Sequence, residues 1–137
     1  MIAYLDSSVV LRVVLGQPGS LREWRAIEIG VASALLEVEC VRTLDRLRLL
    51  EGIAEDEIAR RRETVYRIVE ALTLIEPTRP VLARAAQPLP VVLGTLDALH
   101  LASMEFLRSR NQNLTLASYD DRMITAAQAI GFELAVL

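Results

Sequence analysis

Short apolar runs alternate along the chain with longer segments in which apolar residues recur at helical spacing. The short runs predict five β-strands, at residues 2–5, 30–33, 73–76, 114–118 and 134–137. The longer segments predict six helices, at residues 21–28, 34–50, 56–72, 80–87, 96–108 and about 121–131. Ser20 is the expected N-cap of the first of these helices, and Ser118 or Asp120 caps the last. Residues 7–15 fit a strand or a helix equally well, because so short an apolar run has no decisive period.

The order of these elements indicates an α/β fold. Short apolar strands separated by helices are typical of a buried parallel sheet with helices on both faces. We expect the strand order 3-2-1-4-5, in which the first and fourth strands are neighbours. No repeat or linker interrupts the 137 residues, so we expect one domain over residues 1–137. In such sheets, ligands bind beyond the carboxyl ends of the strands, where the connections change direction.

Four acidic residues stand where a solvated helix face does not readily explain them. Asp6 ends the first predicted strand, Asp120 follows the fourth, and Glu39 and Asp97 lie in the apolar segments LLEVECV and GTLDALHLA. Taken singly, each acid has an ordinary explanation. It can cap a helix, place a charge in a first helical turn or lie at the solvent-exposed edge of a helix. Those explanations do not account for four carboxylates at one edge of one sheet. Carboxylates that converge raise each other's pKa, and a hard cation such as Mg²⁺ or Mn²⁺ removes that penalty.

The amino-acid composition limits the kinds of catalytic site that the chain can contain. All 15 basic residues are arginine, and the chain has a single histidine and a single cysteine. The absence of lysine excludes a Walker A loop and Schiff-base catalysis, and it counts against receiver domains and haloacid-dehalogenase phosphatases. One histidine and one cysteine exclude a multi-histidine metal site, a zinc cluster and an internal disulfide. Water activated by a carboxylate-bound metal ion is the chemistry that this set of residues supports.

Charge and hydropathy bear on location and partners. A net charge of −3 gives no bulk attraction to nucleic acid, so any such role depends on local arginines or on metal ions. The lone cysteine favours a reducing, cytoplasmic compartment, and we expect neither a signal peptide nor a membrane-spanning segment. A mean hydropathy of +0.34 is high for so small a protein and suggests that a partner covers part of its surface.

Four segments resemble the PIN-domain ribonucleases, and specifically the VapC toxins of toxin–antitoxin pairs. They are YLDSSVVLR near the start, SALLEVECVRTL at 33–44, TLDALHLASM at 95–104 and LASYDDRMITAAQAIGF at 116–132. The resemblance covers the chain from end to end and implies a PIN fold. It also implies an endoribonuclease that uses Mg²⁺ or Mn²⁺ to cut single-stranded RNA, forms a homodimer and is inhibited by a cognate VapB-like antitoxin. The competing hypothesis is a PIN-like module that binds or regulates without nuclease activity.

The resemblance assigns site residues position by position. It implies that the catalytic acids are Asp6, Glu39, Asp97 and Asp120, and that metal is bound by Asp6, Asp97 and Asp120. Supporting positions fall on Ser8, Ser118 and Asp121. Asp121 is the rival of Asp120, which the family's spacing of Ser or Thr, one residue, then the acid favours. Glu37 is the rival of Glu39, which has the family's spacing of three residues before an arginine.

Other residues have weaker claims. Arg12, Arg42 and Arg122 lie near the acids in sequence and are candidates for contacting RNA or orienting carboxylates. The run Arg60–Arg62 is better explained as a solvated helix face than as a phosphate-binding patch. We expect His100 and Cys40 to be structural, and Trp24 to pack rather than to stack on a base.

Overall fold

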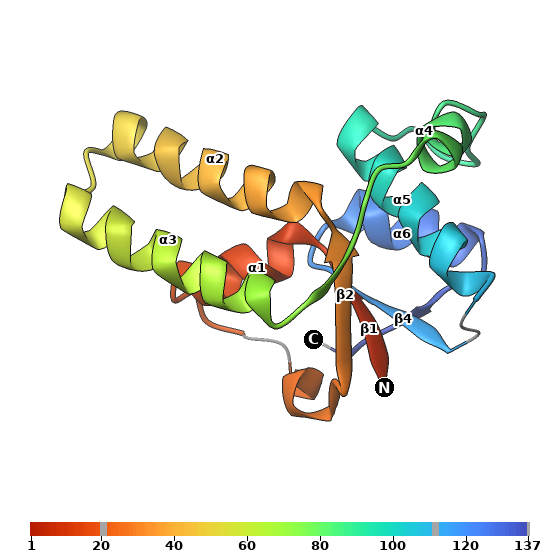
Figure 1. The fold of residues 1–137 in the computed structure, drawn as a ribbon, viewed down its shortest axis with the longest axis horizontal. Helices are drawn as coiled ribbons and strands as arrows, with labels where there is room; N and C mark the ends of the chain where they lie inside the picture. The colour runs from red at the N-terminus through yellow and green to blue at the C-terminus, as the bar shows by residue number, and fades with distance from the viewer. Residues whose placement is uncertain (20–21, 111–112, 137) are drawn as a thin grey trace.

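The computed structural model describes residues 1–19, 22–110 and 113–136, and it contains the predicted parallel sheet (Figure 1). Its strands are β1 (Ile2–Leu5), β2 (Ile29–Ser33), β3 (Thr73–Ile75), β4 (Leu114–Ala117) and β5 (Glu133–Leu134). All neighbouring strands are parallel and their order is β3-β2-β1-β4-β5, which confirms the predicted fold class and strand order. The fifth strand ends earlier than predicted, because its pairing with β4 stops at Leu134; Leu137 lies outside the described residues.

The described α-helices lie close to the predicted ranges. They are α1 (Ser7–Val14), α2 (Leu35–Glu51), α3 (Glu55–Glu70), α4 (Arg79–Ala85), α5 (Thr95–Arg108) and α6 (Asp121–Ala129). The segment that fitted either period is helix α1, and its buried residues Val9, Val10 and Val14 share one helical face. In the part of the chain that the structure describes, no helix combines the length and the apolarity needed to cross a bilayer.

The helix predicted at 21–28 is only a short 3₁₀ helix, η1 (Arg22–Ala26). Its predicted cap, Ser20, and Leu21 lie outside the described residues. The amide of Ile27 donates to the carbonyl of Trp24, which is the i→i+3 bond of a 3₁₀ turn. The amide of Glu28 then donates to the carbonyl of Met1 at 2.9 Å, so the chain is already extended where it enters β2.

Helices cover both faces of the sheet, as predicted. Tyr4 of β1 packs in a core with residues of α5 and α6, among them Leu101 and Met123. Its strand neighbours Ala3 and Leu5 point to the opposite face, where α1 packs on β1 and the α2–α3 hairpin packs on α1 and β2. Figure 1 shows the hairpin extending to one side of the sheet, with α4, α5 and α6 on the other.

The topology brings two strand ends and several helix starts to one edge of the sheet. Strand β1 pairs with β4 as far as Leu5 and Ala117, and the amide of Asp6 donates to the carbonyl of Ala117 at 3.1 Å. Helices α1, α2 and α6 each begin within four residues after the end of a strand. Polar residues at these junctions therefore share one edge, at the point where connections from β1 run in opposite directions.

Candidate active site

The four acids singled out from the sequence line one open pocket at this edge. The pocket measures about 480 Å³, and its lining includes Asp6, Glu39, Asp97 and Asp120. They come from the end of β1, the second turn of α2, the first turn of α5 and the N-cap of α6. Carboxylates that are up to 114 positions apart in sequence are thus brought to one place by the crossovers of the sheet.

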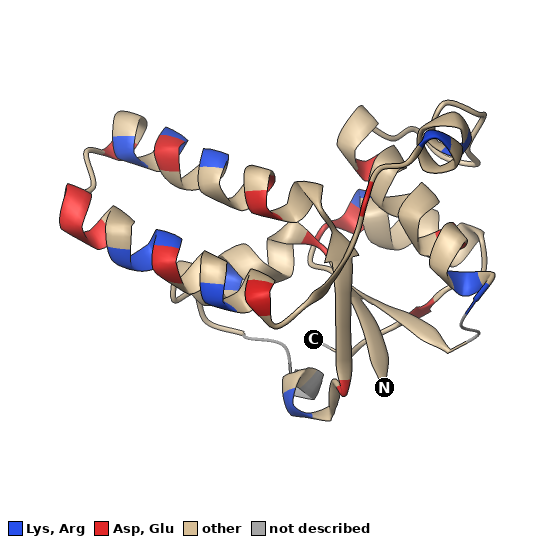
Figure 2. Cartoon of the chain, in the orientation of Figure 1, with Lys and Arg blue, Asp and Glu red and all other residues tan. Residues whose placement is uncertain are grey.

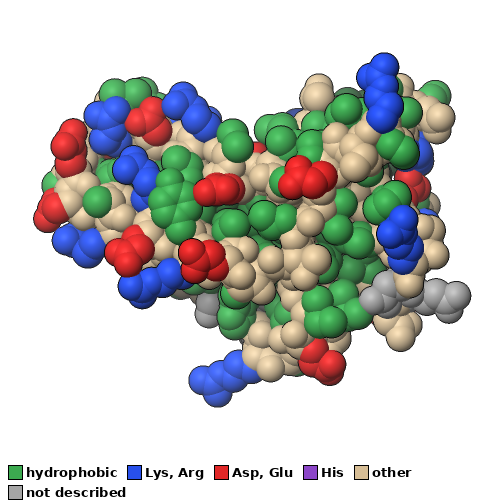
Figure 3. All heavy atoms as spheres, in the orientation of Figure 1, with side chains coloured by type: hydrophobic (Ala, Val, Ile, Leu, Met, Phe, Trp, Pro, Cys, Tyr) green, Lys and Arg blue, Asp and Glu red, His purple; other side chains and the backbone are tan. Residues whose placement is uncertain are grey.

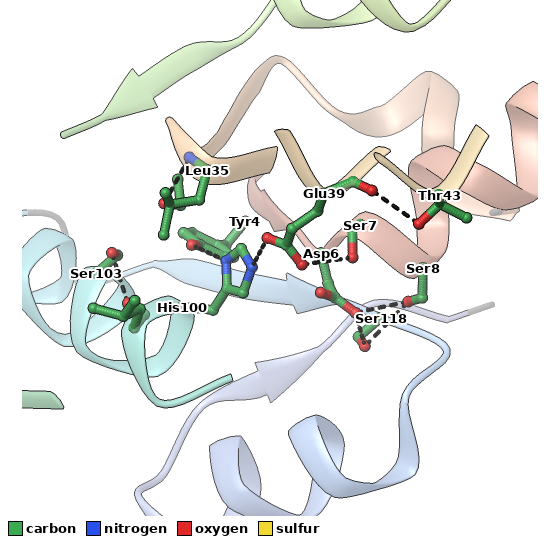
Figure 4. A network of polar contacts seen from close by, with 12 residues as sticks. Tyr4, Asp6, Ser7, Ser8, Leu35, Glu39, Thr43, His100, Ser103 and Ser118 are labelled. Atoms are coloured by element: carbon green, nitrogen blue, oxygen red, sulfur yellow. Dashed lines mark hydrogen bonds and ion pairs between the residues drawn. The ribbon is translucent and has the colours of Figure 1, made fainter. Parts of the chain in front are cut away.

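Asp6 is held by two hydroxyl groups. Its side chain is 3% exposed, and its Oδ2 accepts hydrogen bonds from Ser8 Oγ at 2.7 Å and from Ser118 Oγ at 2.9 Å (Figure 4). Asp6 occupies the N-cap position of α1, yet its carboxylate makes no capping bond to the described residues of that helix. The alternative explanation of Asp6 as a helix cap is therefore wrong. Two serines far apart in the sequence instead hold the buried carboxyl group of Asp6 where it lines the pocket.

The two serines also organise the turn after β4. Ser8 Oγ accepts from the amide of Tyr119 at 2.9 Å, and Ser118 Oγ accepts from the amide of Asp120 at 3.0 Å. Each hydroxyl thus donates to Asp6 and accepts from the backbone. The positions of Asp6 and Asp120 are therefore coupled through Ser118.

Asp120 is a helix cap as well as a pocket residue. Its Oδ1 accepts from the amides of Arg122 at 2.9 Å and Met123 at 3.2 Å, at the start of α6. Both capping bonds use Oδ1, and this fixes the carboxylate while Oδ2 can be directed to a ligand. Asp121 is exposed, in the first turn of α6, and in the described part of the chain it does not line the acidic pocket.

Asp97 shows the electrostatic cost of the cluster. Burial raises the pKa of Asp97, and the charges of Asp120, Asp6 and Glu39 raise it further, against a smaller lowering by His100. The carboxylates therefore repel one another without a counter-charge, as predicted from the sequence.

Glu39 is fixed from two sides. Its Oε1 lies 2.5 Å from Nε2 of His100, and its Oε2 accepts from Ser7 Oγ at 3.2 Å. Glu37, two residues away, points about 200° around the helix from Glu39, and in the described lining of the pocket only Glu39 is present.

The contact between His100 and Glu39 is the feature of the site that the sequence did not predict. His100 is fully buried, and its Nδ1 lies 2.8 Å from the hydroxyl of Tyr4 while Nε2 meets Glu39. Burial lowers the pKa of His100, but the hydrogen bond and charge of Glu39 and the charges of Asp6 and Asp97 outweigh this and raise it. The available signal was its position three residues after Asp97, which puts both side chains on adjoining parts of α5.

The three candidate arginines differ in how close they lie to the acidic pocket. Arg12 donates to the carbonyl of Pro18 at 2.6 Å, and its guanidinium carbon lies 4.1 Å from the centre of the Tyr119 ring. Arg122 is exposed beside Asp121 in a separate hollow. Arg42, which pairs with Asp45 at 3.1 Å, lines a groove that shares Ser7, Glu39 and Leu96 with the acidic pocket.

The remaining expectations concern residues away from the pocket. Arg60 pairs with Asp56 and Arg61 with Glu57 along α3, which is the arrangement of a solvated helix face. Figures 2 and 3 show arginines and acids interspersed over the α2–α3 hairpin rather than gathered in a basic patch. Cys40 is fully buried, as expected, and Trp24 is 37% exposed on η1.

The donor set fits a hard divalent cation. The pocket offers carboxylate and hydroxyl oxygens, which Mg²⁺ and Mn²⁺ prefer, and a cation relieves the repulsion that raises the pKa of Asp97. Among the described residues, no three His, Cys, Asp or Glu side chains are close enough to hold an ion as they stand. Mg²⁺ usually keeps several water ligands, so these carboxylates can hold it partly through water.

Comparison with known proteins agrees with this geometry. The PIN domain model matches residues 3–129 of the chain. Ribonuclease VapC46 of Mycobacterium tuberculosis is 35% identical over 131 residues, which cover 93% of this chain and 92% of that protein. Ribonuclease VapC47 of Mycobacterium tuberculosis is 25% identical over 131 residues, which cover 94% of this chain and 92% of that protein.

Two solved structures share the fold. One is VapBC2 from Rickettsia felis bound to a DNA fragment from its promoter, with a TM-score of 0.65 and 12% identity, covering 98% of this chain and 97% of that chain. The other is VapBC-5 from Mycobacterium tuberculosis, with a TM-score of 0.57 and 15% identity, covering 99% of this chain and 98% of that chain. At these identities the likeness concerns the fold alone.

Proposed function

The chain belongs to the PIN-domain family, as a VapC-type member, and on this premise we propose that it is a metal-dependent endoribonuclease that cuts single-stranded regions of RNA. In the proposal it acts in the cytoplasm as the toxin of a type II toxin–antitoxin pair. The observation that carries the proposal is the convergence of Asp6, Glu39, Asp97 and Asp120 on one pocket. A catalytically silent PIN-like module has no need of a pocket in which burial and neighbouring acids raise the pKa of Asp97.

In the proposed mechanism each acid has a role that its contacts support. Asp6, Asp97 and Asp120 hold Mg²⁺ or Mn²⁺, with Asp6 fixed by its two serines and Asp120 by its helix cap. When bound, the ion supplies charge stabilisation at the phosphoryl group and lowers the pKa of water. Glu39, held through Oε1 by His100, presents Oε2 as the atom that takes a proton from the attacking water. As that proton passes to Glu39, the oxygen of the water bonds to phosphorus and the bond from phosphorus to the leaving ribose oxygen breaks, with a proton from solvent passing to that oxygen.

The groove beside the pocket supports the proposed partners. It is lined by Ser7, Glu39, Arg42, Thr43, Arg46, Leu49, Leu50 and Leu96. Leu49 is 66% exposed and Leu50 76% exposed, so a partner gains by covering them. We assign to this groove the tail of a VapB-like antitoxin, whose apolar side chains cover the leucines while an Arg or Lys reaches the acids. We further propose that the chain forms a homodimer, which light scattering of the purified protein tests; a monomer contradicts it.

The nuclease activity is tested by inducing wild type and Asp97→Asn in a bacterial host and mapping new RNA ends. We expect arrested growth and new ends with wild type, and neither with the variant. Asp121→Asn is the matched control, because it removes an adjacent surface carboxylate and should behave as wild type. Normal growth with no new ends in the wild-type culture contradicts the proposal.

Metal binding is tested apart from activity. We expect Mn²⁺ to raise the melting temperature of wild type, because an ion that binds only the folded state stabilises it. The rise should be much smaller for Asp6→Asn and unchanged for Asp121→Asn. An equal rise in wild type and Asp6→Asn contradicts the assignment of Asp6 as a ligand.

A further inference from the structure

A chain of buried polar contacts leads from the sheet core to one oxygen of Glu39. Tyr4 Oη and His100 Nδ1 are 2.8 Å apart, and His100 Nε2 and Glu39 Oε1 are 2.5 Å apart. Tyr4 and His100 are each 0% exposed, and their rings meet edge to face with centroids 5.9 Å apart. Figure 4 shows the three side chains in line, from β1 through α5 to α2.

These contacts determine how Glu39 can be oriented. Nε2–H of His100 donates to Oε1 whether the ring is neutral or charged, because the Tyr4 hydroxyl can donate to a bare Nδ1 or accept from Nδ1–H. Ser7 donates to the other oxygen, Oε2, from the opposite side. The carboxylate therefore loses its freedom to rotate, and Oε2 is the oxygen that remains on the pocket side with Ser7.

The packing around the histidine makes this a rigid arrangement. His100 is fully buried against the ring of Tyr4, which itself belongs to the core cluster that contains Leu101. A buried imidazole needs partners for both ring nitrogens, and Tyr4 and Glu39 supply them. An apolar side chain would satisfy the packing equally well without a polar contact, so packing alone does not account for a histidine here.

We propose that Tyr4 and His100 form a positioning relay that holds the carboxylate of Glu39 in its working orientation. Neither residue touches the RNA or the reacting atoms; both act through Glu39. This inference rests on the proposed nuclease function, and its consequences fall on the rate of the chemical step rather than on RNA binding.

The first test uses the fact that the chain has one histidine. Labelling histidine with ¹⁵N gives a single set of ring signals, all from His100. We expect a proton on Nε2 that exchanges slowly with water and whose signal moves strongly in Glu39→Gln. A ring proton that exchanges rapidly, or one that does not respond to Glu39→Gln, overturns the proposal without reference to activity.

The second test is kinetic. In His100→Leu, which keeps apolar packing but has no donor, we expect kcat for RNA cleavage to fall about 10- to 100-fold while KM stays within about twofold. His100→Gln, whose amide can replace the Nε2–H donor, should recover most of the loss. Tyr4→Phe, which removes only the hydroxyl, should lower kcat less than His100→Leu does.

Met104→Ala is the control for lost stability. It opens a cavity in the same helix one turn after His100, without touching Glu39, so it should lower the melting temperature and leave kcat unchanged. If folded His100→Leu and Tyr4→Phe cleave RNA as wild type does, the relay is refuted while the nuclease function stands. If wild type itself does not cleave RNA, the proposed function fails, and the ¹⁵N signals still decide whether Glu39 is held by His100.

Discussion

At the scale of single residues, two aspartates in equivalent local positions make different hydrogen bonds. Asp6 and Asp120 both follow a strand and precede a helix, yet Asp120 caps its helix and Asp6 does not. The difference lies in the two serines that donate to Asp6, Ser8 two residues away and Ser118 from 112 positions away. Local sequence favours a cap at both sites. Ser8 is part of the local pattern, but Ser118 reaches Asp6 only because β1 pairs with β4, and no short pattern contains that pairing.

Ser118→Ala should therefore damage the site more than its small size suggests. The change removes the hydroxyl that donates to Asp6 and accepts from the amide of Asp120. We expect RNA cleavage to fall about 10- to 100-fold and the free energy of unfolding to fall by about 1–2 kcal/mol. Ser109→Ala is the control, since Ser109 is exposed and its hydroxyl, among the described residues, donates to the carbonyl of Phe106. Equal activity of the two variants would show that Ser118 does not support Asp6.

The buried thiol of Cys40 leads to a prediction about its chemical reactivity. Burial raises the pKa of the Cys40 thiol to about 12, with smaller contributions from the charges of Glu39 and Asp6. Because a raised pKa keeps the reactive thiolate scarce, a disulfide reagent at pH 8 should modify the folded protein no faster than it unfolds. The control is an exposed thiol, Ser109→Cys in a Cys40→Ala background, which should react at once. Rapid reaction of native Cys40 contradicts the prediction.

At the scale of elements, the sequence predicted the sheet well and its irregular connections poorly. The strands and long helices carry a clear period, and even residues 7–15, which fitted either period, fold as the helix that a parallel connection needs. The helix expected at 21–28 is instead a short 3₁₀ turn, because the following residues must extend into β2. His100 was missed for a related reason. Its partners Tyr4 and Glu39 lie on other elements, and helix spacing within α5 does not reveal them.

Because Asp120 caps α6 and also lines the pocket, two substitutions can distinguish its contribution to stability from its contribution to RNA cleavage. Asn caps a helix as well as Asp does, so Asp120→Asn should leave stability nearly unchanged, whereas Asp120→Ala should cost about 1 kcal/mol. Both variants lose the carboxylate and should lose RNA cleavage to a similar degree. Urea denaturation and a cleavage assay on both proteins measure the two effects. An Asp120→Asn protein with full activity contradicts a role for its charge in the site.

At the scale of the whole molecule, charge is dispersed and the site is the exception. Arginines and acids pair along α3, and the net charge is only −3. We therefore expect no general attraction of RNA to the surface and a dependence of RNA binding on the few arginines beside the pocket. The carboxylates could be identified from the sequence because they interrupt apolar segments. The neighbouring groove could not, because it forms between α2, α1 and α5 only in the folded chain.

This distribution of charge predicts that the affinity for RNA depends only weakly on salt, and that the dependence comes from a few arginines. In an Asp97→Asn background, which prevents cleavage, Arg42→Ala and Arg46→Ala should each lower the slope of log affinity for single-stranded RNA against log salt by about 0.7. Arg60→Ala, on the solvated face of α3, should leave the slope unchanged. Fluorescence anisotropy across a salt series measures it. Equal effects of all three substitutions would contradict RNA binding at the groove lined by Arg42 and Arg46.

The separation of the acids along the chain has a consequence for synthesis on the ribosome. The pocket needs both Asp6 and Asp120, which is made 114 residues later, and the two meet only after β4 pairs with β1. A nascent or truncated chain that lacks β4 has no complete set of carboxylates, whatever the state of its other elements. A ribosome that has not yet reached β4 therefore carries a chain without the complete pocket, and the pocket can form only after that strand has been made and has paired with β1.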